Sequence, residues 1–498
     1  MKVLKIVACF SVLSGAAFGL TIEALPTHGV FYAGLAAQPC LRVKVHAAEG
    51  EKLSQLSFGA GGSAKGAISA AWLYHSSAPF FSLLAEGEAA ASKVAKSSTA
   101  PGTGNMVFKT GGIKLQEGDN YFWLVYDIAS AAKGGDKICG VLKGATNGQG
   151  AEITPAKGRN GTTRADGKTP ATPALVYPFK YRVAPYVRPK FACGSHREMF
   201  TAAHLRQMTD FIVFGYTHAG PRIAPAHDAL QGEKDLAPDC LALARELRGS
   251  GCPTRILAGF SCNEAKNPMS GIMHDAEKRR TLARNMAALV TENGYEGIDI
   301  DWEYPRENAR FKPHATWRKF AVFLAELRAE LAGTGASISI AVTTRYDAPN
   351  IEVLEGVDFI NSMSYGRPGE HSTKAAAQED VDFLLKRKVP PAKIVLGLPF
   401  FSRDTKPKHT DHGGHGYSSI LAWFPNIAPS RNQFTHPQTG DRHFFNGPDL
   451  IRDKCKTFVL RQGIGGVCIW AFDTDVPLSH PKSLSKALYS VIRQAPRQ

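Results

Sequence analysis

The sequence has no long apolar run beyond its first twenty residues, and this absence excludes a membrane-crossing helix in the rest of the chain. Such a helix needs about 20 consecutive apolar residues. Only the start of the chain combines basic Lys2 and Lys5 with a short apolar stretch and the small residues Ala17 and Gly19. This pattern is typical of a secretory signal. We therefore expect residues 1–19 to be a signal peptide and the protein to be secreted or periplasmic.

Cysteine is scarce, and no cluster of cysteine and histidine has the spacing of zinc ligands. We predict no metal site and no cofactor. Cys9 lies in the predicted signal, which leaves eight cysteines for the exported chain. An even number of cysteines in an exported protein is compatible with disulfides. The candidate pairs are Cys40 with Cys139 and Cys240 with Cys252, although spacing alone does not fix connectivity.

Acidic residues are fewer than basic ones, 44 against 59, and the formal net charge is +15. A basic surface attracts polyanions. Nucleic acid is not an expected partner of an exported chain, whereas sialylated or sulfated glycans and acidic cell envelopes are. A generally basic secreted surface without a special role explains the charge equally well.

Helical periodicity is nearly absent from residues 20–180. Leu41, Val43 and Val45 alternate with basic residues, as the side chains of a half-buried strand do, and residues 71–75 have a similar pattern. Turns rich in glycine, serine and alanine separate such runs. We predict an antiparallel β-sandwich for this region, an accessory domain that ends in a linker rich in glycine, threonine and proline.

The run from Leu115 to Leu124 resembles the N-terminal module often attached to bacterial sialidases. No sialidase Asp-box motif is present in the chain, so the resemblance implies a fold and no sialidase activity. The strand-like runs of this domain also contain aromatic residues, which we expect to fill the sandwich core, with sugar binding as the alternative. These are Trp72, Tyr74, Tyr121 and Trp123.

Residues 186–498 alternate short apolar runs with helical patterns, as a (β/α)₈ barrel does, and their number suits that fold. Examples of the helical patterns are residues 275–293, 317–332 and 375–388. The fold class predicted for the whole chain is thus α/β, a TIM barrel preceded by an all-β domain. The eight expected barrel strands are residues 190–193, 210–216, 255–260, 297–303, 337–343, 359–365, 393–398 and 466–470.

The fourth expected strand carries three acids spaced by two, Asp299, Asp301 and Glu303. Side chains at this spacing lie on one face of a strand. The alternative is an edge strand with a wet acidic face, but the helical pattern and Gly294 that precede the run favour a parallel sheet, which is buried on both faces. Burying three carboxyls is costly. We therefore predict that they do chemistry.

The run Glu296-x-x-Asp299-x-Asp301-x-Glu303 resembles the Asp-x-x-Asp-x-Asp-x-Glu pattern of glycoside hydrolase family 18, the chitinases and endo-β-N-acetylglucosaminidases. Its first acid is glutamate here instead of aspartate. The Trp302 that follows Asp301 is closer to the chitinase branch. The resemblance extends over residues 190–490 and implies retaining hydrolysis in which the substrate's own acetamide group is the nucleophile.

By this resemblance Glu303 is the general acid that protonates the glycosidic oxygen and later activates water. Asp301 accepts the acetamide N–H, and Asp299 shares a proton with it, so that the acids titrate as a group. In the sixth strand, Tyr365 is implied to hydrogen-bond the acetamide oxygen and Met363 to line the pocket.

The family's Met-x-Tyr-Asp motif ends in Gly366 here, which puts the sugar contacts of the missing aspartate in doubt. We expect the adjacent Arg367 to offer a basic group to the substrate instead. In the seventh strand Arg403 matches a family arginine, and we count it among the substrate-binding residues. In the eighth strand Trp470 matches the apolar floor beneath the reacting sugar.

The sequence therefore predicts a glycosidase that cleaves β-1,4 linkages after N-acetylglucosamine, with chitin or chitooligosaccharides as substrates. One alternative is cleavage of the chitobiose core of N-glycans or of mucin-type host glycans. Another, of a different class, is a catalytically weak lectin. The presence of Glu303 argues against the lectin.

Overall fold

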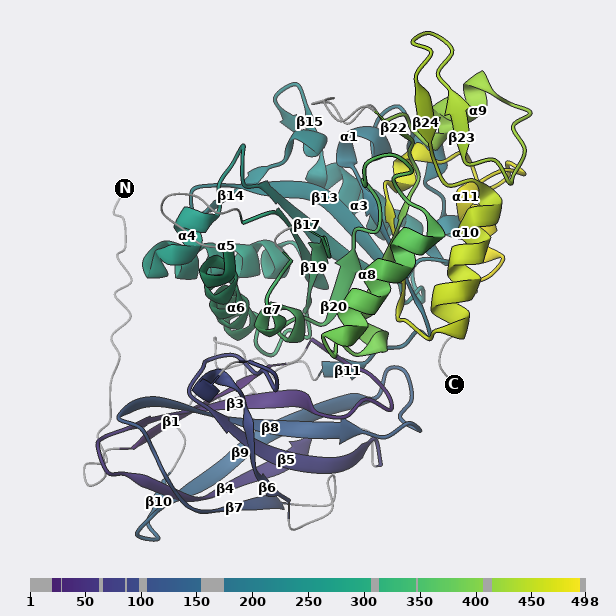
Figure 1. Ribbon diagram of the computed structural model, residues 1–498. Helices are drawn as coiled ribbons and strands as arrows, with labels where there is room; N and C mark the ends of the chain where they lie inside the picture. The colour runs from purple at the N-terminus through teal and green to yellow at the C-terminus, as the bar shows by residue number, and fades with distance from the viewer. Residues whose placement is uncertain are drawn as a thin grey trace.

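The computed structural model describes residues 20–492 except 28, 62–65, 86, 98–104, 154–173, 306–312, 346–347 and 406–413. The predicted signal peptide thus lies outside the described residues, as does most of the predicted linker. Figure 1 shows two bodies, an all-β domain formed by the first part of the chain and an α/β barrel formed by the rest. Among the described helices, none is long and apolar enough to span a bilayer.

The N-terminal domain consists of two sheets that enclose one apolar core, as predicted. Leu41, Val43 and Val45 are fully buried in that core, where they meet residues of the opposite sheet such as Leu56 and Phe58. The first sheet has the order β1 (Thr21–Pro26), β3 (Gln38–Ala47), β8 (Gly118–Ile128), β5 (Ile68–Ser76) and β6 (Ser92–Lys96). The second has the order β2 (Val30–Phe31), β11 (Ala174–Val176), β9 (Lys137–Asn147), β4 (Lys52–Gly61) and β7 (Asn105–Lys114), with β10 (Glu152–Ile153) beside β9.

The aromatic residues expected in the sandwich core lie elsewhere. In β8, Phe122 and Leu124 point into the core, whereas Trp123 belongs to a separate cluster with Tyr74 on the outer face of the sheet. Side chains alternate between the faces of a strand, so a tryptophan between two core residues faces outward. The prediction that these aromatics fill the core was wrong. The likeness of this domain to the sialidase module stays a prediction.

The C-terminal domain is a closed barrel of eight parallel strands, as predicted. The sheet closes through pairing of the first strand with both the second and the last. The barrel strands are β12 (Arg182–Val187), β13 (Asp210–Ala219), β17 (Arg255–Asn263), β18 (Gly297–Glu303), β19 (Ser337–Val342), β20 (Phe359–Ser362), β21 (Ile394–Pro399) and β25 (Gly466–Trp470). Short strands outside the barrel circle are β14 (Arg222–Pro225), β15 (Leu230–Gln231), β16 (Lys234–Asp235), β22 (Arg403–Asp404), β23 (Gln433–Thr435) and β24 (Arg442–Phe444).

The first barrel strand is not where the sequence placed it. Residues 190–193 were expected to form it, but Lys190 lies in the short helix α1 (Pro189–Ala192), and β12 precedes that helix. Pro185 lies inside β12, and proline is rare in central strands because it donates no ladder hydrogen bond. For this reason the strand around Pro185 was not predicted from the sequence. The division of the chain at residues 180–186 stays a prediction.

Helices surround the barrel and bury the outward faces of its strands. In β18 the outward-facing Trp302 packs edge to face against Trp317 and Phe320, with ring centroids 5.3 Å apart in both pairs. The acids of β18 therefore face the barrel interior. The helices are α2 (Ala202–Leu205), α3 (Ala237–Arg248), α4 (Ser270–His274), α5 (Ala276–Glu292), α6 (Pro313–Glu330), α7 (Ile351–Glu355), α8 (Lys374–Lys386), α9 (Tyr417–Trp423), α10 (Pro448–Lys454), which continues into a π-helical turn (Cys455–Arg461), and α11 (Leu484–Tyr489).

The sandwich contacts the N-terminal ends of the barrel strands, as Figure 1 shows. Asp358, which precedes β20, accepts a hydrogen bond from the backbone N–H of Gly29 at 3.3 Å. The hydroxyl of Tyr32 donates to the Asp358 carbonyl at 2.8 Å. Active sites of such barrels lie at the opposite, C-terminal ends of the strands. The accessory domain thus leaves that face of the barrel open.

Neither predicted disulfide is formed, since all eight described cysteines are free. Cys40 does lie near Cys139, whose charged form contributes to raising the pKa of the Cys40 thiol after the larger effect of burial. Cys240 instead contacts Cys193, not Cys252. Separation in the sequence did not reveal which strands and helices the fold brings together.

Candidate functional site

The acidic strand β18 has the predicted bounds, and its deepest acid is held by three donors. Asp299 is fully buried. Its Oδ2 accepts a hydrogen bond from the hydroxyl of Tyr186 at 2.8 Å. Its Oδ1 accepts from Ser339 Oγ at 2.5 Å and from Asn361 Nδ2 at 3.0 Å. Three barrel strands, β12, β19 and β20, thereby fix this carboxyl.

Burial shifts two acids of β18, Asp299 and Asp301, toward their protonated forms. It raises the pKa of Asp299 to about 6, against the opposing effect of its three donors. The pKa of Asp301 is raised well above its usual range, first by burial and then by the negative charges of Glu303 and Asp299. Close carboxyls in a low-dielectric interior cannot all ionise. The pKa values of Asp299 and Asp301 are therefore both raised, and the charges of the neighbouring acids contribute to the shift of Asp301.

Asp301 has a buried acceptor that no described residue satisfies. Its Oδ1 is buried and has no hydrogen-bond partner, while the residue as a whole is 9% exposed. A buried polar atom without a partner is costly. In an enclosed site this atom is available to an N–H group of a ligand.

The residues expected around the acids gather at one end of the barrel. Glu303 ends β18 and is half-buried. Met363 belongs to one buried apolar cluster inside the barrel, and the partly buried Tyr365 and Trp470 pack against that cluster. Burial raises the pKa of Tyr365, and the charges of Asp301 and Glu303 add to this effect, so the tyrosine lies within electrostatic reach of both acids.

Trp470 is packed firmly at the end of β25. Its ring lies edge to face against Phe214, with centroids 4.7 Å apart, and against Tyr186 at 5.6 Å. The same Tyr186 donates to Asp299. The aromatic side chain and the acid row are therefore linked through one shared neighbour.

The two arginines expected to bind substrate have different surroundings. Arg403 Nη1 donates to the carbonyl of Gly366 at 2.9 Å, directly beside Tyr365. Arg367 instead turns to helix α8, where it pairs with Asp380 at 2.8 Å and with Glu379. The structure brings Arg403 to the loop after β20 but shows no contact between Arg367 and the acids.

Sequence reasoning missed the residues that support the acids. Tyr186, Ser339 and Asn361 are all buried. Polar residues inside otherwise apolar barrel strands were the available signal, since buried polar groups require partners. Tyr365 also lies beyond its expected strand, because β20 ends at Ser362. Within the described part of the chain, no group of three or more histidine, cysteine, aspartate or glutamate residues is arranged to hold a metal ion.

The barrel region is similar in sequence to known glycoside hydrolases. The sequence profile of the family described as "Glycosyl hydrolases family 18" matches residues 255–475. The chain is 24% identical to "Probable chitinase 2" of Drosophila melanogaster over 267 residues. This aligned region covers 43% of this chain and 54% of the relative. It is 24% identical over 255 residues to "Chitotriosidase-1" of Mus musculus, covering 40% of this chain and 54% of the relative. The chain thus spans about half the length of these curated relatives.

A solved structure resembles the barrel domain in fold. It is the crystal structure of a chitinase from Bacteroides thetaiotaomicron, with a TM-score of 0.52 and 19% sequence identity. The similarity covers 63% of this chain and 96% of the other. Because 63% of this chain exceeds the length of the sandwich and is close to that of the barrel domain, the similarity includes the barrel.

Proposed function

We propose that this protein is a retaining glycosidase that cleaves β-1,4 linkages after N-acetylglucosamine, because the profile of "Glycosyl hydrolases family 18" matches residues 255–475 of the barrel. Chitin or chitooligosaccharides are the proposed substrates. The matched relatives are described as a chitinase and a chitotriosidase. The placement of Glu303, Tyr365 and Trp470 at one end of the barrel supports this proposal.

The proposed reaction uses the 2-acetamido group of the substrate as the nucleophile. Glu303 protonates the glycosidic oxygen while the acetamide oxygen attacks the anomeric carbon, which gives an oxazolinium ion. Glu303 then takes a proton from water, and the water opens the ion with net retention. Intramolecular attack benefits from proximity, so no second protein nucleophile, metal or cofactor is required.

The single observation that carries this proposal is the unpartnered Oδ1 of Asp301. It lies two residues from Glu303, on the same strand face. The acetamide N–H of a bound sugar is a donor of the kind that this atom lacks. Tyr365, which lies within electrostatic reach of Asp301 and Glu303, is proposed to hydrogen-bond the acetamide oxygen.

Roles for the remaining site residues follow from their surroundings. Trp470 is proposed as the apolar floor under the reacting sugar, with Met363 on the wall. Arg403 is proposed to shape the loop after β20, because it holds the Gly366 carbonyl. A direct substrate contact by Arg367 has less support, since two carboxylates of α8 already bind its guanidinium.

Export of the protein is part of the proposal and rests on residues 1–19 alone. A basic start, a short apolar stretch and small residues at the end support it. An exported enzyme would meet polymeric glycans outside the cell. Its net charge of +15 would favour acidic surfaces.

Cleavage of N-glycan cores or mucin-type glycans is the alternative within the same chemistry. The loss of the family's aspartate at Gly366 changes the sugar contacts and keeps this alternative open. A lectin would need to have lost the acid, and Glu303 is present.

A substrate panel tests the proposal. The wild-type protein is incubated with labelled chitin oligomers, a high-mannose glycoprotein and matched glucose oligomers that lack the 2-acetamido group. We expect cleavage of the chitin oligomers with a β-configured product, observed by NMR. Cleavage of the glycoprotein alone would support the alternative. Efficient cleavage of the glucose oligomers would refute substrate assistance, and binding without cleavage would support the lectin.

A further inference from the structure

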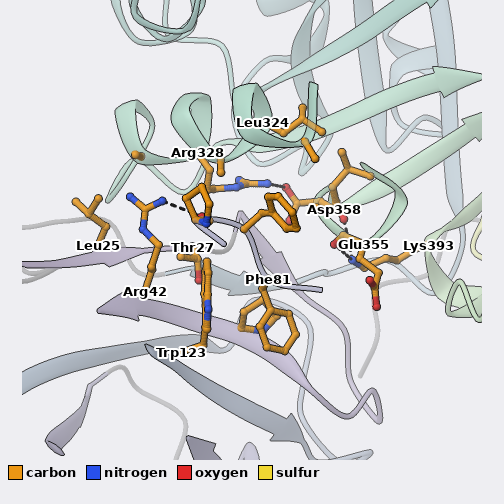
Figure 2. A pocket seen from close by; sticks show the side chains of 18 residues that line it. Leu25, Thr27, Arg42, Phe81, Trp123, Leu324, Arg328, Glu355, Asp358 and Lys393 are labelled. Carbon is orange, nitrogen blue, oxygen red and sulfur yellow. Dashed lines mark hydrogen bonds and ion pairs between the residues drawn. The ribbon is translucent and has the colours of Figure 1, made fainter. Parts of the chain in front are cut away.

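The barrel domain buries a lysine, Lys454, whose charge no carboxylate balances directly. In the described part of the chain the buried lysines and arginines are Arg182, Arg279, Arg328, Lys393 and Lys454. Each of the three arginines forms an ion pair with a carboxylate. Lys393 lies at the domain interface beside Asp358 and Glu355, as Figure 2 shows, and both acids favour its charged form. Lys454 is the most deeply buried of the five, with an exposed fraction of 0%.

Neutral oxygens alone hold the Lys454 side chain. Its Nζ donates to the Ser372 carbonyl at 2.8 Å, to Ser372 Oγ at 2.7 Å and to Asn446 Oδ1 at 2.7 Å. An ammonium group has three donors, so these three oxygens satisfy it. Burying a charge without an opposite charge is nevertheless costly. Lys454 also ends α10 directly before the π-helical turn, and such turns are frequent at functional sites.

Ser372 connects Lys454 to the loop that follows β20. The Ser372 hydroxyl accepts from Lys454 and donates to the carbonyl of Ser364 at 2.8 Å. Both serines are buried. Ser364 immediately precedes Tyr365, so the chain of hydrogen bonds from Lys454 ends one residue before the tyrosine of the candidate site.

His371, the neighbour of Ser372 in the chain, holds the same loop on the other side of Tyr365. Its Nδ1 accepts from the Gly366 N–H at 3.3 Å, and its carbonyl accepts from the Arg367 N–H at 3.2 Å. Its ring lies 5.1 Å from that of Phe401, which in turn packs edge to face against Tyr365 at 5.9 Å. The position of Tyr365 therefore depends on residues 371–372, which Lys454 anchors to α10.

The charge of Lys454 determines the direction of the Ser372 hydroxyl. The ammonium donates to Ser372 Oγ, which leaves the hydroxyl hydrogen for the Ser364 carbonyl. When Lys454 loses a proton to water, the amine gains a lone pair that accepts a hydrogen bond. The Ser372 hydroxyl then turns to this lone pair, and the Ser364 carbonyl loses its donor. A buried carbonyl without a donor is costly, so the loop loosens.

Both forms of Lys454 are populated near neutral pH. Burial lowers its pKa to about 7, against the opposing effects of Cys455 and Asp380. The titratable groups around it keep their charge in this range. Burial raises the pKa of the Cys455 thiol on α10 to about 12 and lowers that of His371 on the loop to about 3. Asp380 of α8 is held in an ion pair with Arg367 at 2.8 Å.

We propose that Lys454 is a positioning residue of the glycosidase, and that its ammonium form, through Ser372, holds the loop after β20 so that Tyr365 faces the acid row. The proposal rests on the proposed role of Tyr365 in binding the acetamide oxygen. Lys454 itself does not touch the substrate. The loop is held below about pH 7 and loosens above it, so kcat/KM declines there in addition to the decline that the loss of the Glu303 proton causes.

Hydrogen–deuterium exchange of the substrate-free full chain tests the state of the loop directly. The peptide that covers residues 363–373 is compared at about pH 6 and about pH 8.5, after correction for intrinsic exchange rates. In the wild type we expect its protection to fall about tenfold between these values, which corresponds to about 1.4 kcal/mol. In Lys454→Met we expect low protection at both. Lys374→Met is the matched control and behaves as the wild type, because Lys374 is 41% exposed and pairs with Asp453 at the surface.

Hydrolysis of a chitin oligomer provides the functional measurement. We expect the ratio of kcat/KM at about pH 6 to that at about pH 8.5 to be about tenfold smaller in Lys454→Met than in the wild type, because only the decline due to Glu303 remains. Ser372→Ala is the second variant. It removes the hydroxyl but leaves Lys454 its contacts with the Ser372 carbonyl and Asn446, so we expect the same loss of protection even if Lys454→Met does not fold.

The two measurements distinguish this proposal from the proposed function. A wild type that does not hydrolyse chitin oligomers would refute the function, and the exchange measurement, which needs no substrate, would still decide the role of Lys454. Equal protection of the wild-type peptide at both pH values would overturn the proposal. Wild-type protection in Lys454→Met and in Ser372→Ala would overturn it as well.

Discussion

Tyr186 and Asp299 are joined by a hydrogen bond of 2.8 Å inside the barrel, although 113 residues separate them in the chain. Asn361 Nδ2 completes a triangle by donating to the Tyr186 hydroxyl at 2.8 Å and to Asp299 Oδ1 at 3.0 Å. The first, fourth and sixth barrel strands thus meet at one carboxyl. The triangle fixes the acid whose negative charge contributes, after burial and Glu303, to raising the pKa of Asp301.

Replacing the tyrosine of this triangle tests its influence on the acid row. In Tyr186→Phe, Asp299 loses a donor that lowers its pKa, so the pKa rises further above the present value of about 6. We expect the acidic limb of the kcat/KM profile on a chitin oligomer to move to higher pH. We also expect a roughly tenfold loss of rate at neutral pH, because one hydrogen bond to a charged group contributes about 1.5–3 kcal/mol.

The control for this change is Tyr417→Phe, which removes a buried hydroxyl that donates to the Lys482 carbonyl far from the acids. It should leave the pH profile in place. If Tyr186→Phe lowers the rate without moving the acidic limb, the triangle does not set the charge of the acid row.

The stability of the barrel depends on pH through Asp299. Its pKa is raised from 3.8 to about 6 in the folded state, so the folded protein binds more protons than the unfolded chain between these values. Stability from this group is therefore present below about pH 4 and is lost as pH rises to about 6. A tenfold change in a dissociation constant corresponds to about 1.4 kcal/mol. We expect the free energy of unfolding of Asp299→Asn to increase by up to about 3 kcal/mol, relative to that of the wild type, as the pH rises from 4 to 7.

Calorimetric melting of both proteins at pH 4 and pH 7 measures this difference. Asp449→Asn, at an exposed carboxyl of α10, serves as the control and should follow the wild type at both values. If the difference in melting temperature between Asp299→Asn and the wild type is the same at both pH values, the raised pKa of Asp299 is contradicted.

The two domains are coupled through Asp358. Its carboxylate accepts from Arg328 Nη2 at 2.6 Å, from the Ile338 N–H at 2.7 Å and from the Gly29 N–H at 3.3 Å. Removing one partner of a buried ion pair costs about 3–5 kcal/mol. We expect Asp358→Asn to lower the melting temperature and to separate the melting of sandwich and barrel into two transitions.

Differential scanning calorimetry follows both effects, again with Asp449→Asn as the control, because an exposed ion pair contributes about 0–1 kcal/mol. A single transition at the wild-type temperature would show that the contact between Asp358 and the sandwich does not hold the domains together.

The sequence predicted the elements whose local pattern is unambiguous. β18 and β25 have the predicted bounds. β18 alternates acids with apolar residues after a clear helix and glycine signal, and β25 is a short apolar run that follows glycines. β12 was missed because Pro185 lies within it. The outward position of Trp123 was also readable in principle, from its place between Phe122 and Leu124, but it was assigned to the wrong face.

The acids themselves were predictable, whereas their support was not. Asp299, Asp301 and Glu303 share one strand, so their common face follows from spacing alone. Ser339 and Asn361 belong to other strands, and their contact with Asp299 depends on the register of the closed barrel. Residue spacing in one strand carries no information about that register. For the same reason the pairing of Arg367 with α8 could not be foreseen.

The most direct measurement is hydrolysis of a labelled chitin tetramer by Glu303→Gln beside the wild type and Glu246→Gln, a change at an exposed glutamate of α3. Loss of a general acid lowers rates by roughly 10²–10⁴-fold. The account predicts such a loss for Glu303→Gln, with the melting temperature and tetramer binding retained, and wild-type hydrolysis for Glu246→Gln. Unchanged hydrolysis by the folded Glu303→Gln variant would contradict it.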